Sequence, residues 1–177
     1  MSRESDFTVH SKYDKYGAIT IRNARQVDKG AIWEIHIRAI KELCKSHYSE
    51  RELQIWTEVL KPVRYQEQIS KGPFFVAVAG DSIIGFGNLN QKSGEIEALY
   101  VDPDHVGRGV GIKILQALEN QALDLGLKLL RLTSSLNAVR FYERAGYKPQ
   151  KQKRWLLPSE MVVCVPMIKE LAEELSW

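Results

Sequence analysis

Apolar residues in the first part of the chain recur at the spacing of helices. Residues 19–22 form a short apolar stretch that predicts a strand, and the apolar positions of 28–43, 49–60 and 65–71 then repeat every three or four residues. Ser49, followed three residues later by a glutamate, gives the second of these segments the capping-box pattern of a helix start. The sequence therefore predicts three consecutive helices after a first strand, with an aspartate at position 28 placed to cap the first helix.

The hydrophobic pattern then changes from helical spacing to short continuous runs. Residues 74–79 and 83–89 are apolar runs, residues 95–101 follow as a third predicted strand, and the turn signals Gly-Asp and Ser-Gly separate the three segments. Runs of this length and spacing are typical of strands joined by tight turns. They predict an antiparallel meander.

The last part of the chain alternates between the two patterns. A glycine-rich turn at residues 106–111 precedes a long amphipathic helix over 110–125, which is followed by a strand over 128–132, a helix over 138–145 and a last strand over 161–167. The order of elements predicts an α/β protein with a largely buried mixed sheet.

Composition limits the setting of this domain. The chain has 177 residues, with 25 Lys and Arg against 22 Asp and Glu, a net charge of +3 that does not favour nucleic-acid binding. No apolar run reaches the roughly 20 residues that a membrane helix needs, and no secretory signal opens the chain. The two cysteines, Cys44 and Cys164, fit a reducing cytoplasm without disulfides. We expect a polar arm at 1–17, one domain at 18–169 and a tail at 170–177.

The glycine-rich turn is the first candidate for chemistry. Gly107, Gly109 and Gly111 alternate between a strand and a helix, where glycines permit positive φ and a close approach of the backbone to a ligand. The helix start adds free N–H groups and a positive dipole end, which together suit a pyrophosphate, and Arg108 adds a charge. The Walker and Rossmann glycine patterns do not fit. Glycines that serve the turn geometry alone remain an alternative.

A wider set of motifs resembles the GCN5-related N-acetyltransferase (GNAT) superfamily. The carriers are Leu-Tyr-Val at 99–101, Pro103, the loop over 106–111 that opens a helix, and Ala-x-x-Phe-Tyr-x-x-x-Gly-Tyr over 138–147. Two positions depart from the family pattern: Val106 replaces a Gln or Arg, and a serine at 135 replaces an Asn. The departures concern contacts to the cofactor and leave the fold unaffected.

The resemblance implies a fold and a co-substrate. The expected fold has N-terminal helices, an antiparallel meander and a central pair of parallel strands that splay apart, with acetyl-CoA in the gap. The cofactor residues that it implies are Leu99, Tyr100, Val101, Val106, Gly107, Arg108, Gly109, Val110, Gly111, Ile112, Ser135, Asn137 and Tyr142. No metal is expected.

The resemblance also implies catalytic roles for an amine that attacks a thioester. Tyr142 matches the family's tyrosine acid, which protonates the departing thiolate, although a packed aromatic is the plain alternative. Glu95 and Glu97 share one face of a strand and are candidates for the base, with Glu97 ranked first. A water chain without a dedicated base is a third option.

The first helices are expected to form the acceptor wall. The acceptor contacts that this implies are His47, Tyr48, Trp56 and Phe86. We expect a cytoplasmic N-acetyltransferase acting on a primary amine of a small molecule by direct attack in a ternary complex. The alternatives are a protein or peptide N-acetyltransferase and a non-catalytic acetyl-CoA sensor. A homodimer is one oligomeric state that the resemblance suggests. A basic run over 148–154 is expected to be a solvated loop, with attraction of the cofactor's 3′-phosphate or of an acidic substrate as the alternative.

Overall fold

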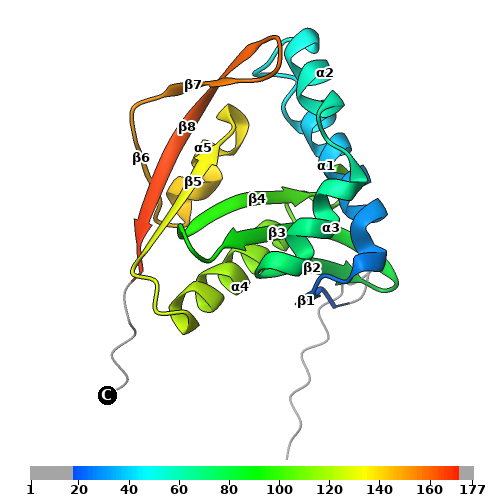
Figure 1. Cartoon of the computed structure of the whole chain (residues 1–177), viewed down its shortest axis with the longest axis vertical. Coiled ribbons are helices and arrows are strands. Elements are labelled where there is room, and N and C mark those ends of the chain that lie inside the picture. Colours follow the sequence, from blue (N-terminus) through cyan, green and yellow to red (C-terminus); the bar gives the residue numbers. More distant parts are fainter. Residues whose placement is uncertain (1–17, 172–177) are drawn as a thin grey trace, which may run out of the picture.

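The computed structural model describes residues 18–171. Within this range eight strands form a mixed sheet in the order β1-β2-β3-β4-β5-β8-β6, with β7 paired to β8 (Figure 1). The strands are β1 (Thr20–Asn23), β2 (Phe74–Ala79), β3 (Ser82–Asn90), β4 (Glu95–Val101), β5 (Leu129–Ser134), β6 (Lys148–Pro149), β7 (Lys153–Leu156) and β8 (Met161–Glu170). The predicted α/β fold with a meander of β2, β3 and β4 is therefore confirmed.

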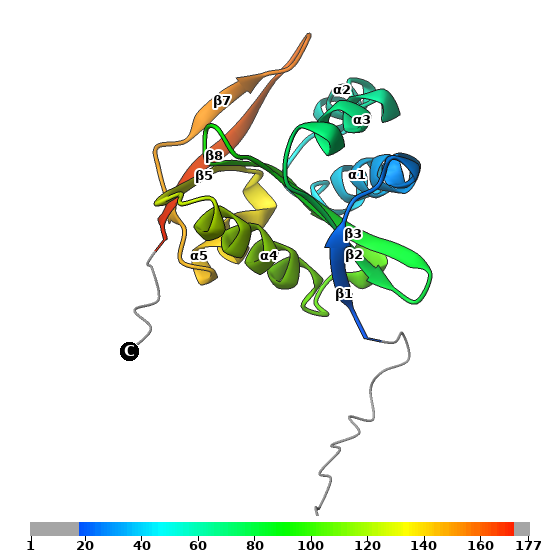
Figure 2. The ribbon, with the colours of Figure 1, turned by 60° about the horizontal axis from the view of Figure 1, so that its bottom comes forward.

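Helices cover both faces of this sheet. The first three helices lie on one face and the last two on the other (Figure 2). They are α1 (Lys29–Leu43), α2 (Glu50–Glu58), α3 (Pro62–Lys71), α4 (Val110–Asp124) and α5 (Val139–Arg144), with short 3₁₀ turns η1 (Gln26–Asp28), η2 (Pro103–His105) and η3 (Leu136–Ala138). The three-layer arrangement buries the central strands of the sheet, such as β3, on both sides. No helix of the described range is long and apolar enough to cross a bilayer.

The helix starts agree with the sequence at one position and differ at another. Ser49 caps α2 as predicted, because its hydroxyl accepts the N–H of Glu52 while the Glu52 carboxylate accepts the N–H of Ser49. Asp28 does not cap α1. Its carboxylate instead accepts the N–H of Arg25 and pairs with Arg22, 2.7 Å away, so it joins β1 to the turn before α1.

The basic run near the C-terminus forms strands that the sequence pattern did not predict. Lys148 begins β6, and β7 carries two further cations, both strands being paired with the long β8. All four residues of β7 are exposed, so the strand has no buried face and leaves no alternation in the sequence. The arm at 1–17 and residues 172–177 lie outside the described residues.

Two neighbouring strands at the centre of the sheet separate along their length. β4 and β5 are parallel and pair at only two positions, Glu95 with Arg131 and Ile96 with Leu132. Beyond these positions β4 stays paired with β3, and β5 with β8, so the two halves of the sheet diverge. This is the splayed pair of strands that the resemblance implied.

A β-bulge lies where the separation begins. It falls between two register pairs of β3 and β4, Leu89 with Ile96 and Asn88 with Ala98. Glu97 is therefore an extra residue in β4. A bulge bends its strand and re-aims the side chain that it carries, and bulges are frequent beside active sites.

Candidate active site

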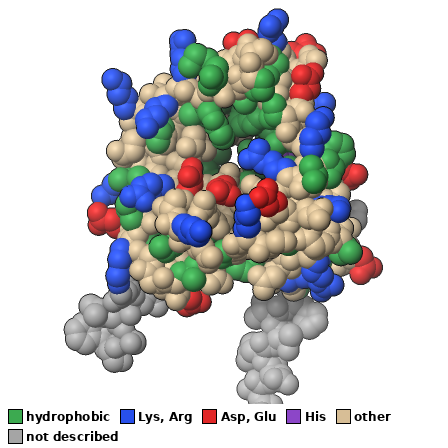
Figure 3. All heavy atoms as spheres, in the orientation of Figure 1, with side chains coloured by type: hydrophobic (Ala, Val, Ile, Leu, Met, Phe, Trp, Pro, Cys, Tyr) green, Lys and Arg blue, Asp and Glu red, His purple; other side chains and the backbone are tan. Residues whose placement is uncertain are grey.

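A cavity of about 410 Å³ occupies the wedge between the diverging ends of β4 and β5. Its walls come from the end of β4, the glycine-rich loop with the start of α4, residues 135–142, and the last turn of α1. Figure 3 shows this face of the molecule hollowed at its centre, with hydrophobic side chains above the hollow and acidic side chains below it. All predicted cofactor residues except Arg108 line the cavity. Their contact with a cofactor stays a prediction.

The unpaired edge of β4 is the first feature of the cavity that is suited to bind a ligand. After Ile96 the side of β4 that faces β5 has no strand partner. Leu99, Tyr100 and Val101 belong to this segment, and all three line the cavity. Backbone N–H and C=O groups are obligatory hydrogen-bonding groups, so an open edge inside a sheet is suited to an extended ligand that takes the place of a strand.

The glycine-rich loop forms the second feature. Gly107 and Gly109 both have φ of 79°, and a Cβ at either position would meet no atom within 4 Å. Backbone conformation therefore requires glycine at these two positions, and the absence of a side chain leaves the loop's N–H groups accessible. Gly111 has a different reason, because a Cβ there would lie 3.3 Å from the ring of Phe141. The N-terminus of α4 follows at Val110 and supplies the positive end of a helix dipole.

The opposite wall of the cavity joins residues from distant parts of the chain. The thiol of Cys44, the residue that directly follows α1, donates to Oδ1 of Asn137, 3.2 Å away, and Ser135 lies beside them. Burial raises the pKa of the Cys44 thiol to about 11, so the thiol stays neutral at physiological pH and is a poor nucleophile. Asn137, one of the predicted cofactor residues, thus lines the cavity beside Ser135.

Tyr142 is the predicted acid and is held firmly in the cavity wall. It is buried, with its ring edge-on to Phe141 and to Tyr147 at centroid distances of 4.9 and 5.7 Å. Burial raises the pKa of its phenol above the usual value of 10. The hydroxyl therefore keeps its proton over the physiological range, which is the state that a proton donor requires.

The four predicted acceptor contacts do not line the wedge cavity. Phe86 is fully buried in an aromatic cluster, Trp56 of α2 packs in a core cluster that includes Ile40 of α1, and His47 is exposed. Tyr48 is a connector: its hydroxyl donates to the carbonyl of Val163 at 2.7 Å and accepts the N–H of Leu136. Their role toward an acceptor stays a prediction, and the contacts observed are structural.

The two candidate bases have different surroundings. Glu95 lies at the paired end of β4, opposite Arg131. Glu97 lies at the bulge and lines a second hollow of about 450 Å³ between α3 and the β3–β4 hairpin. Both oxygens of Glu97 accept side-chain amide N–H groups, from Asn88 at 2.7 Å and from Asn90 at 3.1 Å. We call this second hollow the hairpin groove.

An aromatic cluster connects the wedge cavity to the elements of the hairpin groove. The ring of His36 on α1 lies against that of Tyr100, tilted by 37° at a centroid distance of 4.0 Å, and its Nδ1 lies 2.8 Å from the hydroxyl of Tyr65 on α3. Burial, followed by the charge of Arg64, lowers the pKa of His36 to about 3. His36 is thus a neutral core histidine, as its place on the apolar stripe of the helix predicts.

Sequence patterns missed several residues of the cavity wall. His105 lines the cavity and has Nδ1 at 3.2 Å from the carboxylate of Asp102, which also accepts from Arg38. Cys44 lines it as well, and so does Phe141, which the motif over 138–147 contains but which was not among the predicted site residues. The only hint for Asp102 and His105 is their position around the family's proline, whereas Cys44 lies 93 residues from its partner Asn137 and carries no local signal.

The splayed pair of central strands and the cavity between them are the features expected of an acyltransferase of the GNAT fold. Residues 44–171 match the family model described as an acetyltransferase (GNAT) domain. The chain therefore belongs to the GNAT acetyltransferases and is an N-acetyltransferase of that type. No group of three His, Cys, Asp or Glu side chains in the range 18–171 is arranged as metal ligands are.

Related proteins and solved structures agree with this assignment. The chain is 29% identical to the uncharacterized N-acetyltransferase YafP of Escherichia coli, covering 77% of this chain and 85% of that protein. It is 26% identical to the thialysine N-epsilon-acetyltransferase of Sus scrofa, covering 73% of this chain and 84% of the relative.

Two crystal structures share the fold. A GCN5-related N-acetyltransferase from Rhodopseudomonas palustris has a TM-score of 0.83 at 26% identity, covering 88% of this chain and 98% of that one. The PaiA N-acetyltransferase of Thermoplasma acidophilum, solved in complex with coenzyme A, has a TM-score of 0.74 at 22% identity, covering 86% and 99%.

Proposed function

We propose that the protein transfers an acetyl group from acetyl-CoA to a primary amine of a small molecule by direct attack in a ternary complex. The observation that carries the proposal is the wedge cavity, where an unpaired strand edge and a glycine loop at a helix start lie side by side. The residues fit the co-substrate because each supplies a group that the ligand needs. The edge of β4 offers hydrogen bonds to an extended pantetheine arm, and the loop offers N–H groups to a pyrophosphate.

The residues of the cavity also fit the chemistry. The amine nitrogen forms a bond to the thioester carbon, the carbonyl oxygen gains negative charge, and the carbon–sulfur bond then breaks. A backbone N–H at Leu99 or Tyr100 is suited to stabilise the oxyanion, an effect that is worth about 2.7–4 kcal/mol for one donor. Tyr142 supplies the proton that converts the departing thiolate to a thiol and regains it from solvent.

A proton must also leave the amine, because an alkylamine with a pKa near 10 is mostly protonated at neutral pH. We assign its removal to Glu97, directly or through a water. The bulge, which re-aims the side chain at position 97, supports this choice over Glu95, which lies at the paired end of the strand. A small-molecule acceptor is supported by the thialysine N-epsilon-acetyltransferase relatives, whose named substrate is an amino acid.

The test is a screen of primary amines for release of free coenzyme A thiol, run beside calorimetry of acetyl-CoA binding. We expect acetyl-CoA to bind and at least one small primary amine to be acetylated. Binding without turnover over small amines and peptides alike would support a sensor instead. Turnover of peptides alone would support the protein acetyltransferase, and no binding at millimolar acetyl-CoA would refute the proposal.

A further inference from the structure

The amide of Asn88 is held in an orientation that costs the folded protein a hydrogen bond. Its Nδ2 donates to Oε2 of Glu97 at 2.7 Å, while its Oδ1 is buried and has no hydrogen-bond partner. The whole residue is 4% exposed. Buried polar groups without a partner are rare and destabilising, so this one needs a reason.

Glu97 provides that reason. A carboxylate only accepts hydrogen bonds, so the amide of Asn88 must turn its N–H side toward Glu97 and its oxygen toward the interior. Asn90 meets the other oxygen of Glu97 without the same cost. Its own Oδ1 accepts the backbone N–H groups of Lys92 and Ser93 in the β3–β4 turn. Two amides from one strand thus fix one carboxylate at the bulge, and one of them does so at the expense of its own oxygen.

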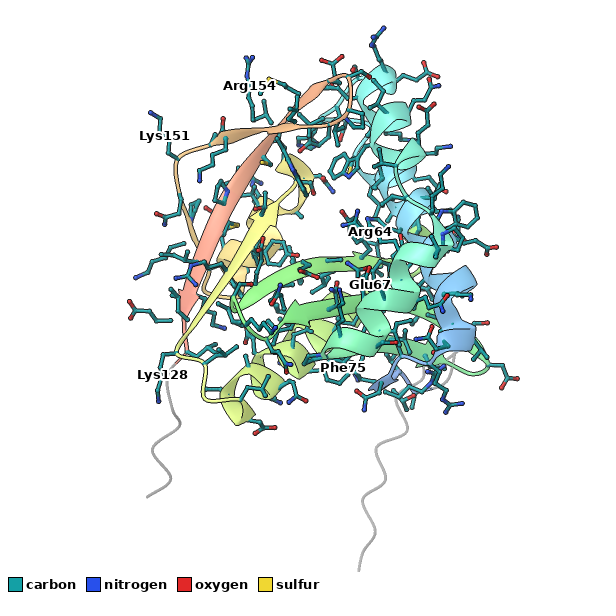
Figure 4. The ribbon with its side chains drawn as sticks, in the orientation of Figure 1. Arg64, Glu67, Phe75, Lys128, Lys151 and Arg154 are labelled. Atoms are coloured by element: carbon teal, nitrogen blue, oxygen red, sulfur yellow. The ribbon has the colours of Figure 1, made fainter. Side chains whose placement is uncertain are left out.

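The carboxylate so fixed is not neutralised by the protein. Glu97 is exposed to the hairpin groove and forms no ion pair within residues 18–171. Lys71 lines the same groove but is paired with Glu67 of its own helix, and Lys92 lies in the lining without reaching ion-pair distance of Glu97. Figure 4 shows Arg64 and Glu67 on α3, beside the strands of the meander. Two amide N–H groups leave about half of the acceptor sites of Glu97 free for a ligand.

We infer that Asn88 is the positioning residue of an ammonium site in the hairpin groove, where Glu97 receives the primary ammonium of the acceptor. The inference rests on the proposed function and adds to it the residue that orients the carboxylate toward the acceptor. A primary ammonium fits because it brings a compensating charge and three N–H donors. A quaternary ammonium brings the charge and no donor, and the site should discriminate against it.

The first experiment uses the full chain saturated with coenzyme A, so that no acetyl transfer occurs. We titrate it with n-butylammonium chloride and follow the side-chain amide signals of Asn88 and Asn90 by NMR. We expect both signals to shift with saturation, and butyltrimethylammonium to bind at least tenfold more weakly. In Asn88→Leu, followed on Asn90, the dissociation constant of n-butylammonium should rise at least tenfold.

Stability separates positioning from a structural role. Leucine is close to asparagine in size and removes the unpartnered oxygen, so Asn88→Leu should keep or raise the melting temperature while it weakens ammonium binding. The matched control is Asn120→Ala, which removes an exposed amide from α4 on the other face of the sheet and should change neither quantity.

The possible results distinguish failure of this inference from failure of the proposed function. Absence of shifts at Asn88 and Asn90 with coenzyme A bound overturns the inference and leaves the proposed function intact. So does a lowered melting temperature of Asn88→Leu with unchanged ammonium affinity, which would make Asn88 a purely structural residue. Failure of coenzyme A itself to bind refutes the proposed function instead.

Discussion

The wedge cavity and the hairpin groove lie along the same strand, and they are built from different kinds of groups. The wedge cavity, at the end of β4, is lined by backbone, glycines and apolar side chains. The hairpin groove, at the start of β4, is lined mainly by charged and amide side chains. Glu97, the extra residue at the bulge, is the residue by which β4 contributes to the hairpin groove.

This difference distinguishes a site that members of a family have in common from a site that is specific to one member. A site made of backbone groups depends on chain path, so many sequences with the same glycines and strands can build it. A site made of carboxylates and amides depends on individual side chains, which can change without loss of the fold. We therefore expect the wedge cavity to take the common co-substrate and the hairpin groove to decide the acceptor.

The largest expected effect comes from Tyr142→Phe. Loss of a positioned acid should lower kcat by about 10²-fold or more, with acetyl-CoA affinity unchanged, because the ring remains in place. Tyr147→Phe is the control, since Tyr147 touches the Tyr142 ring but does not line the cavity. Steady-state thiol release and calorimetry give the two quantities. An unchanged kcat in Tyr142→Phe would leave this residue with a packing role.

Glu97→Gln tests whether chemistry at the groove is independent of co-substrate binding. We expect kcat/KM for the amine to fall about 10²-fold while the affinity for acetyl-CoA stays within twofold. Glu95→Gln should change kcat/KM only slightly, because Glu95 lies at the paired end of β4. Equal and small effects of both substitutions would favour the water chain over a glutamate base.

Gly109→Ala perturbs the wedge cavity alone. An alanine with φ near 79° costs about 1–2 kcal/mol of stability, and it narrows the phosphate approach, so acetyl-CoA affinity should fall about tenfold. Gly126→Ala imposes the same strain at φ of 74°, also in open space, at the end of α4. Chemical unfolding should give similar losses for both variants, and calorimetry should give a weaker affinity only for Gly109→Ala. Equal acetyl-CoA affinities of the two variants would contradict a role of the glycine-rich loop in binding the pyrophosphate.

The smallest effect concerns the aromatic cluster under Tyr100. The pKa of His36 falls from 6.5 to about 3 on folding, so the unfolded chain binds the extra proton more readily between these values. The stabilisation that neutral His36 contributes to the folded state is fully present well above pH 6.5, and it decreases as the pH falls below 6.5. Between pH 7 and pH 6 the loss is about 0.7 kcal/mol, measurable by urea unfolding. His36→Gln should remove this part of the pH dependence, and an unchanged slope would show that another group causes it.

Local patterns predicted those parts that depend on near neighbours in the chain. The meander needs only runs of apolar residues and turn signals, and the loop at 106–111 needs only glycines before a helix, so both followed from the sequence. β7 escaped prediction because an exposed edge strand has no buried face. The link between Cys44 and Asn137 escaped as well, since its two residues are 93 positions apart.

The sequence by itself determined the family, the order of the elements and the residues of the glycine loop, because turn conformation and hydrophobic period are local properties. Only the tertiary structure decided that Glu97 stands at a bulge, that Asn88 gives up a hydrogen bond to hold it, and that Phe86 and Trp56 lie in the packed core. Burial and side-chain pairing depend on which distant segments meet in space, and the spacing of residues along the chain does not contain that information.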